Sequence, residues 1–333
     1  GGRDIVATYE PAAPDGEESV AVGHTLMSDA VLVPNPTGLH ARPAAVLASL
    51  AKKYSSQVLL RRGDDTANAK SVMAIMGLEV YQGNKVRVVA TGADAQAAIV
   101  ELADAIADGL GEEGVVRLTD APDGINPPAE PIAPAPSSRP RSEDPNVLLG
   151  VAASPGLGVG TVLQIRKQEI TVTEEASDKH AERRQLNDAL DRATVQLQAL
   201  QDKLTAESDA DKAAIFSAHQ QLLSDPDLLD IATSMIDKGK SAPFAWRAAY
   251  TMYAERLAGL KSEVLAGRAN DVRDVGLRVL EELTGQRSER PDIPAGTILI
   301  AEDLTPSDTA SLDRTRVVGF ATVAGGASSH VAI

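Results

Sequence analysis

A proline-rich stretch divides this chain into two parts that fold separately. Residues 119–145 combine serine, alanine and charged residues with prolines that include Pro127, Pro128, Pro131, Pro134, Pro136, Pro140 and Pro145. This composition is typical of an extended, semi-stiff linker, because it cannot bury enough apolar surface to form a core. We therefore expect a linker at 116–146 between folded parts at 28–115 and 147–333. Such a linker raises the effective concentration of each part at the other.

The composition and charge of the chain exclude several kinds of partner and site. The 333 residues carry a formal net charge of −15, which argues against nucleic acid or an anionic membrane as a partner. The absence of cysteine excludes disulfides and thiolate metal sites, and we predict no metal site in the chain. No apolar run approaches the ~20 residues that span a bilayer, and no signal peptide is recognisable, so we expect a cytoplasmic protein. Residues 1–27 begin without a methionine and become polar and acidic, so we expect the tail of an upstream domain and a linker.

The most informative motif is Asn35–Ala45, which contains His40. An apolar run at 30–33 leads into it and a helix-period apolar run leads out, so His40 lies where a strand gives way to a helix. The free N–H groups and the dipole of a helix N-terminus attract anions, and Arg42 adds a guanidinium suited to phosphate oxygens. Pro43 is tolerated in a first helical turn. The pattern predicts that His40 accepts and donates a phosphoryl group. The alternative is a capping histidine on a surface helix.

Residues 28–115 alternate between strand and helix signals. The pattern predicts strands at 31–33, 57–61 and 85–90, a short paired segment at 68–69, and helices at 44–53, 72–77 and 95–110. This order suits an antiparallel sheet with helices on one face. Ser71 is predicted to cap the helix at 72–77, which stabilises it by about 1 kcal/mol. Ser71 is also a candidate for regulatory phosphorylation.

The motif at Asn35–Ala45 resembles the active-site signature of HPr, the histidine phosphocarrier of the bacterial phosphoenolpyruvate:sugar phosphotransferase system. Residues 69–78 resemble the second HPr motif, with Ser71 at the regulatory serine position. The resemblance spans about 28–115. It implies an α+β HPr-like open-faced β-sandwich in which His40 is phosphorylated and Arg42 assists.

Residues 147–333 combine strand signals near both ends with a long helical block at about 174–285. Strand-like runs occupy 147–160, 162–165, 298–300 and 317–320. The helical stripes comprise Leu186, Leu190, Val195, Leu197, Leu200 and Leu204, then Ile215, Phe216, His219, Leu222 and Leu223, then Trp246, Tyr250, Tyr253 and Leu257. We interpret these stripes as the core of a helical bundle inserted into an α/β domain.

A second histidine, His330, lies in Gly325–Ile333 after the last predicted strand. Two glycines there permit close backbone approach, and Ser328 and Ser329 supply hydroxyl and N–H groups. The stretch resembles the active-site motif of Enzyme I of the same system, and the resemblance covers nearly all of 147–333. It implies an α/β swivelling phosphohistidine domain, with an inserted α-helical HPr-binding subdomain and His330 as the phosphorylated residue.

The same resemblance suggests two supporting residues. Thr309 matches the family threonine that hydrogen-bonds the unphosphorylated imidazole, and Lys212 matches a lysine near it. We interpret His180 as a solvated surface residue and His219 as a packing or hydrogen-bonding residue in a helix that faces the HPr docking surface.

Charge predicts how the two parts meet. The basic residues near His40 are Arg42, Lys52, Lys53, Arg61, Arg62 and Lys70, and the acidic residues of the helical block are Glu174, Glu175, Asp178, Glu182, Glu207, Asp209, Asp211, Asp225 and Asp227. We expect the basic face to dock on the acidic face.

The two resemblances imply that a phosphoryl group passes from phosphoenolpyruvate via His330 to His40, and on to an EIIA domain or protein that drives sugar uptake and phosphorylation. Whole Enzyme I has a C-terminal domain that binds phosphoenolpyruvate and Mg²⁺ and dimerises. Because the sequence stops three residues after His330, we expect a fragment of a longer, homodimeric phosphoenolpyruvate-protein phosphotransferase. We expect this fragment to have no cofactor of its own and no turnover of phosphoenolpyruvate alone.

Two alternatives remain open from the sequence. The chain could be the phosphoryl donor subunit of a dihydroxyacetone kinase, because that subunit joins similar modules. It could also be a regulatory module that docks on other proteins without phosphoryl transfer.

Overall fold

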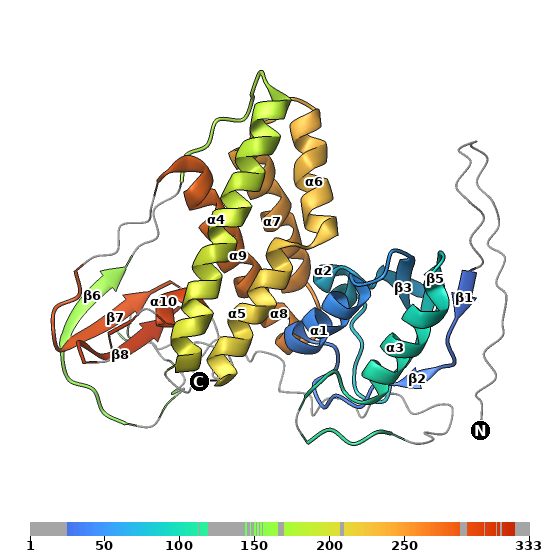
Figure 1. Cartoon of the computed structure of the whole chain (residues 1–333). Coiled ribbons are helices and arrows are strands. Elements are labelled where there is room, and N and C mark those ends of the chain that lie inside the picture. The colour runs from blue at the N-terminus through green and yellow to red at the C-terminus, as the bar shows by residue number, and fades with distance from the viewer. Residues whose placement is uncertain are drawn as a thin grey trace.

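The computed structural model shows two parts in contact, an α/β part at 25–118 and a largely helical part at 156–323 (Figure 1). The structure describes residues 25–112, 114–118, 144, 147, 150, 152, 154, 156–165, 170–206, 210–286, 292–302, 304–310, 312–313 and 315–323. The side chains of 210–214, 263, 264, 306 and 310 are outside this description.

The first part is built on an antiparallel sheet. Its strands are β1 (Thr25–Met27), β2 (Val31–Leu32), β3 (Gln57–Arg62), β4 (Asp65–Asn68) and β5 (Lys85–Thr91). The strand order is β1-β5-β3-β4, and β2 also pairs with β5. Alternate residues of β3 and β5 are buried, as expected for a sheet with one face on a core. Leu60 opposite Val88 sets the register.

Three helices complete this part, namely α1 (Ala41–Ala51), α2 (Val72–Gly77) and α3 (Ala95–Ala107). Helix α3 packs on β5, β3, β2 and β1, and α1 packs on α2 and α3. Leu47, Ile75 and Leu102 join Leu60 and Val88 in the core. The predicted antiparallel sheet with its three helices is therefore observed, and α2 has the predicted bounds.

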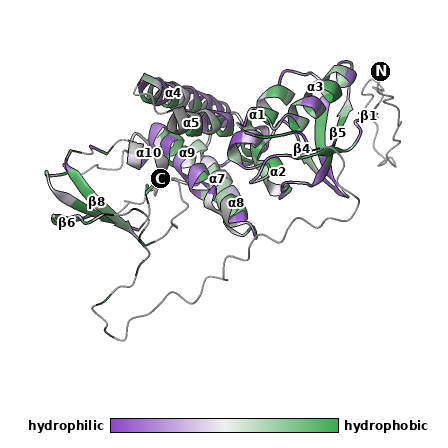
Figure 2. Cartoon of the chain, turned by 90° about the horizontal axis from the view of Figure 1, so that it is seen from below, coloured by the Kyte–Doolittle hydropathy of each residue, from purple (hydrophilic) through white to green (hydrophobic). Residues whose placement is uncertain are grey.

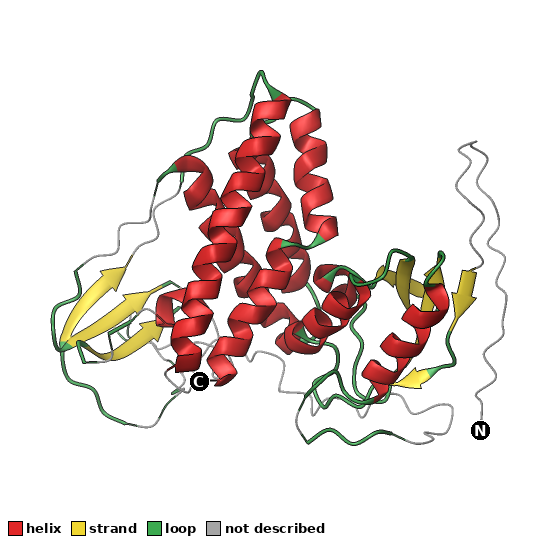
Figure 3. Ribbon diagram, viewed as in Figure 1, coloured by secondary structure: helices red, strands yellow, loops and turns green. Residues whose placement is uncertain are grey.

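The second part is dominated by helices (Figure 3). They are α4 (Lys179–Ala206), α5 (Ala210–Leu223), α6 (Pro226–Asp237), α7 (Ala242–Ala258), α8 (Glu263–Gly267) and α9 (Ala269–Thr284). Trp246 is completely buried and donates a hydrogen bond to the Gly276 carbonyl oxygen at 2.8 Å. Gly285, with φ of +68°, ends α9 in the left-handed conformation that glycine adopts easily.

The helical block lies between two strands of a small parallel sheet, as predicted. The sheet has the order β6-β7-β8, from β6 (Thr161–Ile165), β7 (Thr297–Ala301) and β8 (Val317–Thr322), and α10 (Pro306–Ala310) connects β7 to β8. Its strands are coloured as largely apolar in Figure 2, and Val162, Val318 and Phe320 are exposed.

Several sequence expectations differ from the structure. The helix predicted at 95–110 ends at Ala107. The strand β1 was not predicted, and it forms by pairing with β5. Val195, which we placed in a buried stripe, is 69% exposed, because it lies two residues from both Ala193 and Leu197 and therefore on the opposite side of α4. Residues 157–160 form no strand, and half of 147–156 lies outside the described residues. Within the described part of the chain, no helix combines the length and apolar character needed to cross a membrane.

Candidate active site

His40 lies at the N-cap position of α1, between the sheet and the helix. Its position is fixed by the preceding turn, in which Gly38 has φ of +71° and Leu39 N–H donates to the Val80 carbonyl oxygen at 2.9 Å. A Cβ at Gly38 would lie 2.1 Å from that same oxygen, so only glycine fits. The His40 side chain makes no capping hydrogen bond to the helix, and its ring stands at the N-terminus of α1, as the sequence predicted.

A small cavity of about 40 Å³ lies beside His40, where the two parts of the chain meet. Its lining consists of His40, Ala41 and Arg42 from the first part and Ile215, Ala218, Arg268 and Asp271 from α5 and α9. Two guanidinium groups, one from each part, therefore border the same space as the imidazole. Arg268 is held by an ion pair to Asp271 at 3.5 Å.

The surroundings of His40 favour its neutral form. Burial is the largest cause that lowers the His40 pKa below its ordinary value of 6.5, and the positive charges of Arg268 and Arg42 lower it further. The hydrogen bond and the negative charge of Glu112 oppose this shift. A neutral imidazole has a free ring lone pair and can act as a nucleophile at neutral pH.

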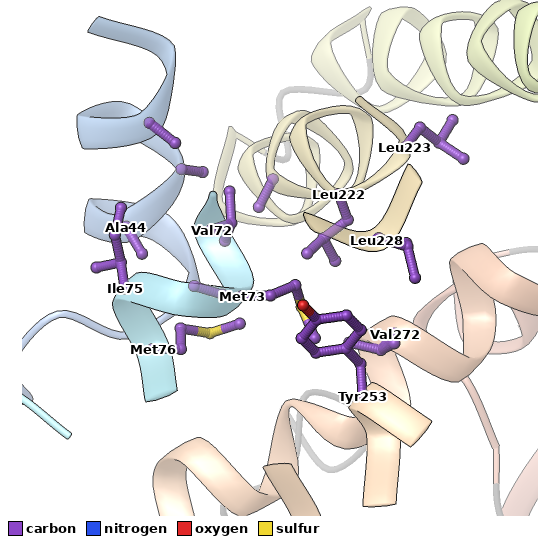
Figure 4. Packing of buried hydrophobic residues seen from close by; sticks show 14 of the residues in the cluster. Ala44, Val72, Met73, Ile75, Met76, Leu222, Leu223, Leu228, Tyr253 and Val272 are labelled. Carbon is purple, nitrogen blue, oxygen red and sulfur yellow. The ribbon is translucent and has the colours of Figure 1, made fainter. Parts of the chain in front are cut away.

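The contact between the parts has an apolar centre (Figure 4). Met73 of α2 lies among Leu222 of α5, Tyr253 of α7 and Val272 of α9, and all four are buried. These residues belong to a single apolar cluster that runs through both parts. Burial of this surface away from water therefore holds α2 against the helical block.

Polar groups surround that centre and include the predicted regulatory serine. Ser71 caps α2 as predicted, since its Oγ accepts from Ala74 N–H at 3.0 Å. The same hydroxyl donates to Asp225 of the helical part at 2.9 Å, and Asp225 also accepts from Met73 N–H at 3.1 Å. Lys52 donates to Ser224 Oγ at 2.8 Å. Both Ser71 and Asp225 have no exposed surface in this arrangement.

Charge contributes less to this contact than the sequence suggested. Asn68 donates to Asp227 at 3.0 Å, and Asp225 also lies in the contact, but Glu174 and Glu175 pair with Lys240 of the helical part itself. A carboxylate already paired within its own part is a weaker attraction for a second cation. Of the acidic residues named from the sequence, Asp225 and Asp227 lie in the contact, whereas Glu174 and Glu175 pair within the helical part.

None of the other predicted site residues is placed beside His40 by the described part of the structure. Thr309 lies in α10 and donates to the Thr305 carbonyl oxygen at 3.3 Å. Lys212 lies in the first turn of α5, and its side chain is outside the described residues. Ser328, Ser329 and His330 lie outside the described residues altogether, so the structure does not test their predicted roles.

His180 and His219 lie as we interpreted them. His180 is exposed at the start of α4. His219 is 1% exposed in α5, 3.6 Å from Asp271 and 3.8 Å from Asp274. The His219 ring packs edge-on against the Phe216 ring, with the ring centroids 5.4 Å apart.

Sequence reasoning missed three residues that contact the site. Glu112 Oε1 lies 3.3 Å from His40 Nε2 and Arg268 lines the cavity. Asn35 donates to Glu112 at 2.6 Å. Asn35 could have been found, since it opens the motif around His40. Glu112 and Arg268 carried no local signal because they lie far from His40 in the sequence.

Comparison with protein families finds three matches along the chain. Residues 27–108 match the family model described as PTS HPr component phosphorylation site, 149–268 match PEP-utilising enzyme, N-terminal, and 293–333 match PEP-utilising enzyme, mobile domain.

Three curated relatives resemble most of the chain. It is 38% identical over 284 residues to a multiphosphoryl transfer protein of Rhodobacter capsulatus and 37% identical over 305 residues to one of Xanthomonas campestris, covering 84% and 90% of this chain. It spans 33% and 35% of those two proteins. It is also 30% identical to the phosphoryl donor subunit DhaM of a PEP-dependent dihydroxyacetone kinase of Klebsiella michiganensis, covering 92% of this chain and 59% of that subunit.

Proposed function

We propose a function in phosphoryl transfer from one premise: the chain joins an HPr domain to the N-terminal and mobile domains of PEP-utilising enzymes. In this proposal His40 receives a phosphoryl group from phosphorylated His330 and passes it to an EIIA domain or protein in sugar uptake. The donor side is a phosphoenolpyruvate-protein phosphotransferase activity. The chain spans about a third of the length of its multiphosphoryl relatives. We therefore propose, for the full-length protein, the phosphotransferase activity, its requirement for Mg²⁺ and its dimeric state.

The observation that carries the proposal is the position of His40 in the contact between the parts. Its imidazole borders a cavity that Arg42 and Arg268 also line. Guanidinium groups bind phosphoryl oxygens strongly and offset the charge of a group in transit. Since this pairing of arginines exists only when the parts are docked, docking itself assembles the charge needed for transfer.

The transfer step balances without a metal or a co-reactant. A lone pair of the neutral His40 ring forms a new N–P bond, and the N–P bond of the donor phosphohistidine breaks and returns its electron pair to the donor ring. One histidine N–P bond forms as another breaks, so the net change in bond energy is small. Catalysis therefore consists mainly of aligning the two rings and neutralising charge in the interface.

Transfer between the two histidines can be tested with two complementary variants. The His40→Ala chain is labelled on His330 by reverse transfer from a separately purified, radiolabelled phospho-HPr, and is then mixed with the His330→Ala chain. We expect acid-labile label to move to His40 of the second chain. Label that never leaves the first chain would reject the proposal. A chain carrying both substitutions is the control and should gain no label.

A second candidate function rests on the match to the DhaM subunit, which covers 92% of this chain. In that case His40 serves a dihydroxyacetone kinase rather than sugar uptake. Purified phosphorylated chain can be offered an EIIA protein or a dihydroxyacetone kinase as acceptor. Loss of label to the EIIA protein alone supports sugar uptake, and loss to the kinase alone supports the second candidate. A docking module without transfer predicts no label on His40 at all.

A further inference from the structure

An unusual turn after α3 brings an acidic side chain back to His40. Gly109, Leu110 and Gly111 have φ values of +79°, +54° and +77°. The two glycines adopt these values easily, but a left-handed leucine costs roughly 1 kcal/mol or more, so the surroundings must hold Leu110 in place. Leu110 is buried, and a Cβ at Gly109 would lie 2.6 Å from the Val115 side chain. The turn fixes where Glu112 lies.

Both oxygens of the Glu112 carboxylate have a partner. Oε1 lies 3.3 Å from His40 Nε2, and Oε2 accepts from Asn35 Nδ2 at 2.6 Å. Asn35 has no exposed surface, and its Nδ2 also donates to the Gly109 carbonyl oxygen at 2.9 Å. Two acceptors therefore fix the orientation of the Asn35 amide. The amide in turn orients the carboxylate toward the imidazole.

We propose that Glu112, held by Asn35, is a positioning residue for His40. Its carboxylate accepts a hydrogen bond from Nε2–H and so keeps the ring in the tautomer whose Nδ1 carries the lone pair. Nδ1 is then the atom that attacks phosphorus. This inference rests on the proposed function, because it concerns the same transfer step.

The carboxylate also balances charge during that step. As the Nδ1 lone pair forms the N–P bond, the ring gains positive charge that is shared with Nε2–H, and the donor ring loses the same charge when its own N–P bond breaks. No proton has to move. Arg42 and Arg268 disfavour positive charge on His40, whereas Glu112 favours it. Glu112 therefore stabilises the phosphorylated ring without weakening the arginine contacts to the phosphoryl oxygens.

Nitrogen NMR of histidine-labelled chain tests the tautomer directly. Wild type is expected to show a protonated Nε2 and an unprotonated Nδ1. In Glu112→Gln the carboxamide oxygen turns to Asn35, which is the closer partner, so that its N–H groups face His40 Nε2. That variant is expected to favour the opposite tautomer, and Glu112→Leu should show a mixture. Glu101→Gln, an exposed charge loss on α3, is the matched control and should resemble wild type.

The rate of label transfer to His40 completes the test, with each variant made in the His330→Ala chain. We expect Glu112→Gln and Glu112→Leu to accept label about 10-fold more slowly than the control, the size typical of losing one hydrogen bond to a charged group. An unchanged tautomer in both variants, or a rate within about twofold of the control, overturns the inference. Absence of label on His40 in the unaltered chain overturns the proposed function instead.

Discussion

Ser71 Oγ lies 2.9 Å from Asp225 Oδ1, and this hydrogen bond joins the first part of the chain to the helical part. The Asp225 carboxylate accepts from Ser71 and from Met73 N–H at the start of α2, and from Asp227 N–H at the start of α6. One buried side chain therefore caps a helix of each part. Burial raises the Asp225 pKa, and the hydrogen bonds from Met73 and Ser71 oppose that shift.

A negative charge at Ser71 is expected to separate the parts. Phosphorylated Ser71, or Ser71→Asp, would place that charge against the buried Asp225 carboxylate, which has no water to screen it. Amide exchange at Met73 should then rise by at least about 10-fold, because its N–H donates to Asp225. Transfer to His40 should slow in parallel. Thr66→Asp, on exposed β4, is the control, and equal exchange in both variants would contradict this reading.

Loss of the Arg268 guanidinium is expected to slow transfer while leaving docking intact. Arg268→Gln keeps the length of the side chain but removes one of the two positive charges beside the cavity. We expect the transfer rate to His40 to fall about 10–100-fold, with unchanged amide exchange at Met73. Arg184→Gln, an exposed position on α4, should transfer at the wild-type rate. An equal fall of the transfer rate in Arg268→Gln and Arg184→Gln would contradict a specific role for Arg268.

The His40 pKa is expected to depend on docking. It is lowered below 6.5, first by burial and then by Arg268 and Arg42, so the docked ring stays mostly neutral at pH 6.5 and is protonated only at lower pH. Met73→Asp should undock the parts and raise the pKa toward 6.5, because it removes part of the burial and the Arg268 charge. Proton NMR titration measures this. Val100→Asp, at an exposed position of α3, should leave the His40 pKa unchanged.

Gly276 is expected to be essential for packing of α9 on α7. A Cβ at this position would lie 2.3 Å from Tyr250 Cγ, and its carbonyl oxygen accepts the Trp246 indole N–H. Gly276→Ala should lower the free energy of unfolding by about 1–3 kcal/mol, as other overpacked cores do. Chemical denaturation measures the change. Gly267→Ala, where nothing lies within 4 Å, should change stability by less than about 0.5 kcal/mol.

Local patterns predicted most elements because their signals are local. The helix α2 was found from its cap, since Ser71 precedes an apolar run, and the helical block from its periodicity. The strand β1 could not be found in this way, because three residues are too short to show a period. It exists because the backbone of β5 offers it a partner.

The sequence by itself determined that His40 stands at a helix start beside Arg42 and that Ser71 caps α2, because each depends on neighbours along the chain. Only the tertiary structure decided that Asp225 also caps α2, that Arg268 faces His40, and that Glu112 holds its ring. Those contacts join residues far apart in sequence, and their energies exist only once burial of apolar surface has brought the two parts together.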